Sequence, residues 1–296
     1  MRKTFVAAAT AIATLLTPSS AYSWGAVAHR YIMGRAIDLL PAEIKPFFDE
    51  HRPELVLRVN DPDLWRVAGF DEESPNHFID LGVAEYGPYP FVALPRDLDG
   101  AIEKFGLATV RREGLLPWRT MEEFGNLRRT MEAVGRHSLY ADGNTVFFAA
   151  VLAHYVQDAH MPLHVHNNFD GQLTGQVGVH SRFESELFER YSSRLTIKPE
   201  TPAPVTNVRD FIFEVILASH QLVPQLLEAD KRAAAGRKTY DDEYFEKFFS
   251  DIKPLLEQQL GRSITATAAA ITGAWVGAGK PQLGASARRI QPVKAR

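Results

Sequence analysis

Two histidine–carboxylate pairs are the residues in this sequence whose types and spacing most clearly indicate chemistry. His154 precedes Asp158 by four positions, and His180 precedes Glu184 by the same interval. Residues four apart lie on one face of a helix, so each pair would aim an imidazole and a carboxylate at a common point. Nitrogen and oxygen donors held this closely suit a zinc ion. The two pairs therefore predict metal sites carried by helices.

Further metal-capable side chains surround these pairs. Six of the ten histidines fall between positions 137 and 180, and His164 is one of them. Nearer the start, Asp63 and His77 are fourteen residues apart, and His29 lies five residues after Trp24. A single histidine–carboxylate pair is more often a satisfied core pair or a surface pair than a metal site. Because the pairs recur and other candidates accompany them, the sequence favours a metal cluster.

The elements that must hold these residues are predicted to be helices. Apolar residues recur every three or four positions over residues 26–40 and 119–140. Asn144 is predicted to cap an apolar helix that runs to about His160, and the stretch 166–178 contains three glycines and predicts a loop. Few runs alternate as half-buried strands do, so we expect an all-α fold, a single compact multi-helix domain. Further helices are expected near residues 180–193, 207–229, 240–260 and 262–277.

Residues 1–23 have the pattern of a secretory signal peptide. A basic start is followed by an apolar stretch, residues 5–16, that is too short to span a bilayer comfortably. The small residues Ala21 and Ser23 predict cleavage between Ser23 and Trp24, which would give a periplasmic or secreted protein. The alternative is an uncleaved membrane anchor, which the small-residue site disfavours.

Composition restricts the classes of protein that fit. The chain has no cysteine, so no disulfide can form and stability must come from a large core, helped by metal. Removing residues 1–23 deletes two basic and no acidic residues, which takes the formal charge from −3 to −5. Bulk charge therefore gives no evidence for a nucleic-acid partner, and nothing indicates an obligate protein partner. No repeat or linker divides residues 24–280, so we expect one domain there, followed by a flexible basic tail over residues 281–296.

In their order and spacing, these candidate residues resemble one superfamily, the zinc-dependent phospholipases C and the fungal-type single-strand nucleases. The resemblance runs from Trp24 to about Pro281. It implies a mainly helical fold around three zinc ions, a phosphodiester substrate, and nine ligand residues, with Asp158 bridging two ions. The implied ligands are Asp63, His77, His154 and Asp158 for the first ion, Trp24 (amino group and carbonyl), His29 and Asp158 for the second, and His164, His180 and Glu184 for the third.

The implied role of Trp24 links export to the site. A free α-amino group donates a lone pair once it is deprotonated, and its ordinary pKa of about 8 makes this feasible. Cleavage before Trp24 would then be part of assembling the active site.

Several residues near the expected ligands could be mistaken for metal ligands. Asp61 competes with Asp63 as a ligand, but the spacing to His77 favours Asp63. His160 and His166 match no ligand position and are expected to have supporting or structural roles. His51, His137 and His220 are expected to be ordinary surface or satisfied histidines.

Three residues near the expected ligands are candidates for substrate binding. Phe78 follows a ligand and could stack on a substrate ring or be a core aromatic. Asp80 could accept a hydrogen bond from an imidazole or contact substrate. Arg66 could bind a phosphate or pair with a ligand carboxylate.

The implied reaction is hydrolysis of a phosphodiester by zinc-bound hydroxide, with Asp158 and Asp63 as the catalytic metal-holding residues. Zinc lowers the pKa of bound water from about 15.7 to about 7. The aromatic and acidic residues Phe78 and Asp80 resemble the nuclease branch, while Glu184 and the lack of cysteine resemble the phospholipase branch. We favour a single-strand nuclease or 3′-nucleotidase over a phospholipase C. A non-catalytic exported metal-binding protein is the remaining alternative.

Overall fold

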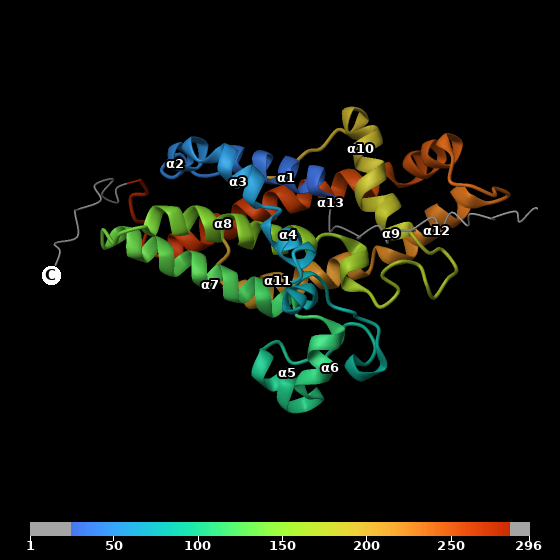
Figure 1. Cartoon of the computed structure of the whole chain (residues 1–296), viewed down its shortest axis with the longest axis horizontal. Helices are drawn as coiled ribbons and strands as arrows, with labels where there is room; N and C mark the ends of the chain where they lie inside the picture. The colour runs from blue at the N-terminus through green and yellow to red at the C-terminus, as the bar shows by residue number, and fades with distance from the viewer. Residues whose placement is uncertain (1–24, 285–296) are drawn as a thin grey trace, which may run out of the picture.

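The structure, a computed structural model, describes residues 25–284, and all regular structure within them is helical (Figure 1). The expected all-α fold class is confirmed. The expected signal peptide over residues 1–23, Trp24, and residues 285–296 of the expected tail lie outside the described residues. The helices are α1 (Ala26–Asp38), α2 (Lys45–Glu50), α3 (Arg52–Arg58), α4 (Asp61–Val67), η1 (Asp71–His77), η2 (Ala84–Tyr86), α5 (Leu98–Phe105), α6 (Leu107–Glu113), α7 (Leu116–Gly135), α8 (Ala141–Asp158), η3 (Pro162–Val165), α9 (Val179–Ser181), the π-helix η4 (Arg182–Glu186), α10 (Leu187–Tyr191), η5 (Ser192–Arg194), α11 (Val208–His220), α12 (Val223–Ala234) and α13 (Asp242–Gly277).

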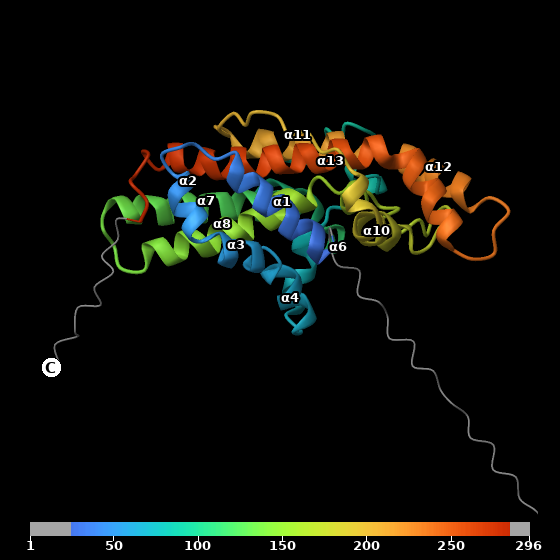
Figure 2. The same cartoon turned by 90° about the horizontal axis from the view of Figure 1, so that it is seen from above.

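The centre of the fold is α8, which is buried on every side over its last ten residues. A helix that is apolar all round must be enclosed by other elements, and α8 packs against α7, α13, α3 and α1. In Figure 2, α13 runs along one side of the bundle, α7 and α8 lie along the other, and α4 projects from the body. Because α8 also carries His154 and Asp158, the same packing that buries the core buries these two side chains.

A second hydrophobic cluster covers the opposite face of α8. Residues 79–118 pack there through Ile79, Leu81 and Tyr86 against Val151 and Tyr155 of α8 and against α11. This segment forms the lobe with α5 and α6 below the bundle in Figure 1. None of the helices within residues 25–284 is long and apolar enough to cross a lipid bilayer.

Helix boundaries differ from the sequence expectation at three places. The central helix begins at Ala141 rather than after Asn144, because Tyr140 takes a left-handed conformation (φ 62°) and ends the preceding turn. The single segment expected over 207–229 is two helices, α11 and α12, with Pro224 in the first turn of the second. The two helices expected over 240–277 are one helix of 36 residues, α13.

Glycines inside α13 permit close backbone contact rather than ending the helix. A Cβ on Gly273 would lie 2.3 Å from the carbonyl oxygen of Val205, and one on Gly261 would lie 3.1 Å from that of Lys198. The segment between these two contacts therefore lies directly on the helix, and Val205 N donates to the Ala269 carbonyl oxygen. The expected boundary between residues 260 and 262 is therefore wrong, because the sequence does not show the contact that Gly261 makes with Lys198.

Replacing Gly273 with alanine should destabilise the fold by about 1–3 kcal/mol, since the added methyl overpacks a backbone contact. Gly143, in the first turn of α8, has nothing within 4 Å of its Cβ position, so Gly143→Ala should stabilise by up to about 1 kcal/mol. Urea unfolding of both variants measures the difference. Equal effects of the two substitutions would contradict the contact.

Candidate metal centre and adjoining pocket

Three buried groups of histidine and carboxylate side chains lie together in the fold. The ligand-type atoms within each group are all within 4.8 Å of one another, so each group could hold a metal ion. The groups are Asp63–His77–His154, His29–His154–Asp158 and His164–His180–Glu184. All eight expected ligands within residues 25–284 belong to these groups.

Six separate elements bring these residues together. His29 comes from α1, Asp63 from α4 and His77 from the end of η1, while α8 supplies His154 and Asp158. The third group comes from η3, which begins at Pro162 and carries His164, and from the helix formed by α9 and η4, which carries His180 and Glu184. Local spacing explains why His154 and Asp158, and His180 and Glu184, face the same point. The packing of α8 against its neighbours explains why residues from different elements meet there.

Asp158 lies between the groups and faces both sides with its two oxygens. Its Oδ2 is 3.1 Å from His77 Nδ1 and 3.2 Å from His154 Nε2. Its Oδ1 is 3.4 Å from His29 Nε2 and 3.7 Å from His164 Nδ1. A carboxylate placed in this way could offer one oxygen to each of two neighbouring cations.

Backbone carbonyls fix the tautomers of two ligand histidines. His154 Nδ1 is 2.8 Å from the carbonyl oxygen of Val59, and His180 Nδ1 is 2.8 Å from that of Phe169. A carbonyl oxygen only accepts, so Nδ1 carries the hydrogen in both rings. In the neutral ring, Nε2 then presents a lone pair to the centre of the group, as a metal ligand must.

These lone pairs face other electron-rich atoms. His154 Nε2 is 3.0 Å from His77 Nδ1, and His180 Nε2 is 3.1 Å from both His164 Nε2 and Glu184 Oε2. Among residues 25–284, Glu184 Oε1 and His164 Nδ1 are buried and have no hydrogen-bond partner. A hydrogen on one of the two ring nitrogens, or a cation between the paired atoms, would satisfy each of these contacts, so the donor set is compatible with bound metal ions.

The spacing of the third group matches the ligands of one small ion. Two ligands about 2.1 Å from a zinc ion in tetrahedral geometry lie roughly 3.4 Å apart. His180 Nε2 is 3.1 Å from Glu184 Oε2, and His164 Nε2 is 3.6 Å from the same oxygen. Two imidazoles and one carboxylate leave a coordination position open, which is typical of catalytic rather than structural zinc.

The buried carboxylates stay ionised because histidines surround them. Burial opposes ionisation of Asp158, but His154 and His164 hold the pKa of its carboxyl well below the usual 3.8. Burial also opposes ionisation of Glu184, yet His180 and His164 lower its pKa from the usual 4.5. Buried anions must be compensated, and the surrounding imidazoles, or cations held by them, can supply that compensation.

Two polar residues behind the ligands were not singled out by the sequence. Gln157 Oε1 lies 2.7 Å from His29 Nδ1. Glu73 Oε1 lies 3.5 Å from His77 Nε2 and accepts a hydrogen bond from the Tyr155 hydroxyl. Both contacts orient a ligand ring from its outer side. Their sequence signal is weak, because only the fold brings them to the ligands.

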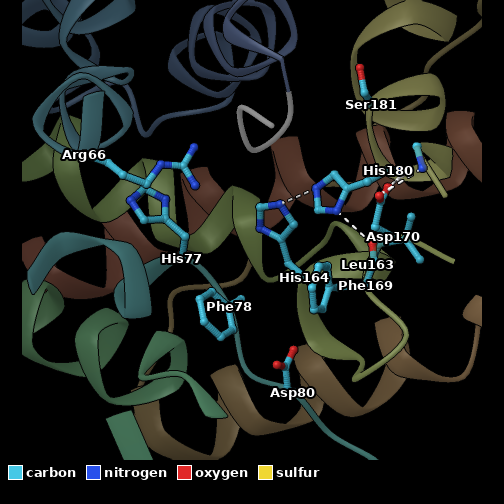
Figure 3. Close-up of a pocket in the computed structure, with 11 residues that line it drawn as sticks. Arg66, His77, Phe78, Asp80, Leu163, His164, Phe169, Asp170, His180 and Ser181 are labelled. Atoms are coloured by element: carbon cyan, nitrogen blue, oxygen red, sulfur yellow. Dashed lines mark hydrogen bonds between the residues drawn. The ribbon is translucent and has the colours of Figure 1, made fainter. Parts of the chain in front are cut away.

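A pocket of about 310 Å³ opens beside the first and third groups (Figure 3). All three expected substrate residues line it. Arg66 also pairs with a ligand, since its Nη2 is 3.2 Å from Asp63 Oδ1, so both of its expected roles are compatible with the structure. The lining residues are Arg66, His77, Phe78, Asp80, Leu163, His164, Phe169, Asp170, Gly178, His180 and Ser181.

Phe78 is a pocket residue rather than a core aromatic. It belongs to neither hydrophobic cluster and is only partly buried. Its backbone lies against Gly114, where φ is +99° and an added Cβ would be 2.1 Å from the Phe78 carbonyl oxygen. The close contact fixes the backbone from which the ring reaches the pocket.

The loop over residues 166–178 supplies pocket residues that the sequence did not identify. Phe169 lines the pocket, and its carbonyl oxygen accepts from His180. Asp170 also lines it and accepts from the backbone nitrogens of Gly178 and His180. The available signal was the position of this glycine-containing loop between two expected ligands.

The remaining candidates lie outside the three groups. Asp61 pairs with Arg58 at 3.2 Å, so the structure places Asp63 and not Asp61 among the possible ligands. His160 is buried, and its Nδ1 donates to the Val156 carbonyl oxygen. His166 stacks on His220, with ring centroids 4.6 Å apart.

The ninth expected ligand, Trp24, is not among the described residues. The neighbouring Gly25 lies against Ser185, since a Cβ on Gly25 would be 2.5 Å from Ser185 Oγ. Ser185 directly follows Glu184, so the start of α1 and the third group are adjacent.

No protein-family model matches this sequence, and no curated protein matches it either. The resemblance drawn from the sequence therefore stays a prediction, and the geometry of the three groups and the pocket carries the functional argument.

Asp80 should make the stability of the protein depend on pH. Burial, and then the charge of Glu113, raises the pKa of Asp80 from 3.8 to about 7, and its Oδ1 has no hydrogen-bond partner among residues 25–284. A carboxyl with a raised folded pKa destabilises the fold as pH rises from about 4 to about 7, and the penalty is complete above that range. Asp80→Asn should therefore stabilise by roughly 1–3 kcal/mol at pH 8 and by little at pH 4. Denaturant unfolding at the two pH values measures this, and a destabilised variant at pH 8 would contradict it.

Proposed function

We propose that this protein is an exported, metal-dependent phosphodiester hydrolase that uses zinc. The observation that carries the proposal is the pocket, which is lined by His77 of the first group, His164 and His180 of the third, and the cationic Arg66. Nitrogen and oxygen donors, and an open position at a three-ligand group, suit zinc. A phosphodiester bound in this pocket would lie against possible metal ligands and a guanidinium.

Each residue would have a separate role in such a site. When bound, the metal ions supply Lewis-acid charge and lower the pKa of water at neutral pH. Asp63 and Asp158 hold cations on the side of the first two groups, and Asp158 faces the third group through its other oxygen. Arg66 binds phosphate oxygens from the pocket wall, with its orientation set by Asp63. The apolar surroundings of α8 keep bulk water away from the buried carboxylates.

A single-stranded nucleic acid or a 3′-nucleotide is the substrate class we favour. Phe78 presents an aromatic ring at the pocket wall, and Asp80 lies in the same wall two residues further on. Stacking of a base on an aromatic side chain contributes about 1–3 kcal/mol. An adjacent carboxylate can accept hydrogen bonds from base donors.

Phospholipid is the second candidate, favoured by apolar surface near the pocket. The exposed Phe169 lines one side. On the other side, Leu64 and Val67 flank Arg66 on α4 and are exposed. These side chains would contact lipid acyl chains if the substrate were drawn from a bilayer.

Asp158→Asn should abolish turnover and reduce the number of bound zinc ions. The neutral amide removes the charge that faces both sides of the centre, and we expect a loss of roughly 1000-fold or more in kcat. Asp61→Asn is the matched control, because Asp61 lies beside the α4 ligand in sequence but pairs with Arg58. Metal content and kcat of both variants are measured on protein that begins at Trp24. Full activity of the chelated, metal-free protein would contradict metal dependence.

Parallel assays identify the substrate. Single-stranded DNA, RNA, a 3′-mononucleotide and phosphatidylcholine vesicles are supplied to the same zinc-loaded protein. We expect cleavage of a nucleic-acid substrate, and we expect Phe78→Ala to raise its KM about 10-fold or more, the equivalent of the lost stacking. Hydrolysis of the vesicles alone would replace the nuclease proposal with the phospholipase. No turnover of any substrate by zinc-loaded protein would favour a binding protein.

A further inference from the structure

In the sequence, a buried arginine lies between two possible metal ligands of the third group. Arg182 is the first residue of the π-helix η4, two residues after His180 and two before Glu184, and only 4% of it is exposed. It is not part of the pocket wall and belongs to none of the three groups. The function proposed above gives it no role.

The guanidinium joins η4 to two distant helices. Arg182 Nη2 donates to Asp230 Oδ1 of α12 at 2.9 Å, and Nε donates to the Tyr244 hydroxyl of α13 at 2.9 Å. The Tyr244 hydroxyl in turn donates to Asp230, which is fully buried. The ion pair therefore holds the helical turn that carries His180 and Glu184 against α12 and α13.

The same guanidinium also holds the end of the loop over residues 166–178. Its Nη1 donates to the Val177 carbonyl oxygen at 3.0 Å, and Nη2 donates to the Gln176 carbonyl oxygen at 3.1 Å. Gln176 closes the network, since its Nε2 donates to Asp230 Oδ2 at 2.7 Å. Loop and helix are therefore fixed to one buried charge pair.

This loop orients a ligand directly. The Phe169 carbonyl oxygen accepts from His180 Nδ1, and Asp170 accepts from the backbone nitrogens of Gly178 and His180. A Cβ on Gly178 would lie 2.9 Å from Arg182 Nη1, so a side chain there would displace the guanidinium. Hydrogen bonds therefore connect Arg182, through the loop over residues 166–178, to the imidazole of His180.

We propose that Arg182, with Asp230, is a positioning residue for the His164–His180–Glu184 group and sets the affinity of that group for its metal ion. The inference rests on the proposed metal-dependent function. Residues that orient a ligand from behind typically change metal affinity by about 10–100-fold when they are replaced. By contrast, a buried ion pair that serves stability alone can often be replaced by apolar residues without loss.

Two glycine substitutions separate positioning from loop strain. Gly178→Ala places a methyl against Arg182, whereas Gly175→Ala adds similar backbone strain, at φ +72° against +85°, with nothing within 4 Å of the new methyl. Bound zinc is counted after dialysis at fixed free zinc, and affinity is measured by competition with a chromophoric chelator. We expect Gly178→Ala to weaken one zinc site about 10–100-fold and to leave the others unchanged. Gly175→Ala should leave all sites unchanged.

The charge pair itself is tested with Asp230→Asn and with the double variant Arg182→Met, Asp230→Leu. The double variant removes both charges, so it keeps the fold even if Asp230→Asn does not. Far-UV circular dichroism checks the fold, and hydrogen exchange reports the loop over residues 166–178. We expect a folded double variant with one weakened zinc site and faster exchange in that loop.

Distinct results identify which idea fails. Wild-type zinc affinity at every site in folded Gly178→Ala and in the folded double variant would overturn the role of Arg182 and leave the metal-dependent function standing. If His164→Ala binds as many zinc ions as the wild-type protein, the third group holds no metal, and both the proposed function at that group and the role of Arg182 fail.

Discussion

The site depends on one physical constraint, which is that Asp158 is a carboxylate at the end of a helix with no access to solvent. Burial raises its pKa, and the pKa stays low because His154 of the same helix and histidines from three other elements, α1, η1 and η3, turn toward it. A buried anion without compensation is too costly for a folded protein to keep. The convergence of α1, η1, η3 and α8 on one point is therefore an electrostatic requirement as well as a packing arrangement.

The positive charge at this point is not supplied by lysine or arginine. The nearest basic side chain to the first group is Arg66, which contacts Asp63 at the pocket rather than entering the centre. Imidazole nitrogens surround Asp158, and the carbonyl oxygens of Val59 and Phe169 hold the outer sides of the His154 and His180 rings in the groups. The backbone thus decides which nitrogen of each ring faces inward, and that choice makes the groups suitable for metal ions.

Rigid packing and an irregular loop contribute to the site in different ways. The core around α8 and α13 fixes most residues of the first two groups within α-helices, and only His77 lies in a 3₁₀-helix, η1. The third group instead combines a 3₁₀-helix, a π-helix and a loop, which need extra hydrogen bonds to stay in place. The buried pair Arg182–Asp230 provides these at the junction with α12 and α13. Single polar contacts from Gln157 and Glu73 support His29 and His77, whereas a network of several hydrogen bonds supports the third group.

The sequence by itself determined the helical class, the approximate course of α1, α8 and the helix over residues 179–191, and the side chains able to bind metal. Those features depend on local spacing, because residues three or four apart in a helix point to the same side. The spacing to His77 already favoured Asp63 over Asp61, and the fold placed Asp63 in a group. The tertiary structure alone decided that Gly261 lies within a continuous helix, and that Glu73, Gln157, Asp170 and Arg182 support the possible ligands. Each of these depends on contacts between residues far apart in the chain, often through backbone atoms. Backbone carbonyls are the same at every position, so no sequence pattern marks which of them will meet an imidazole.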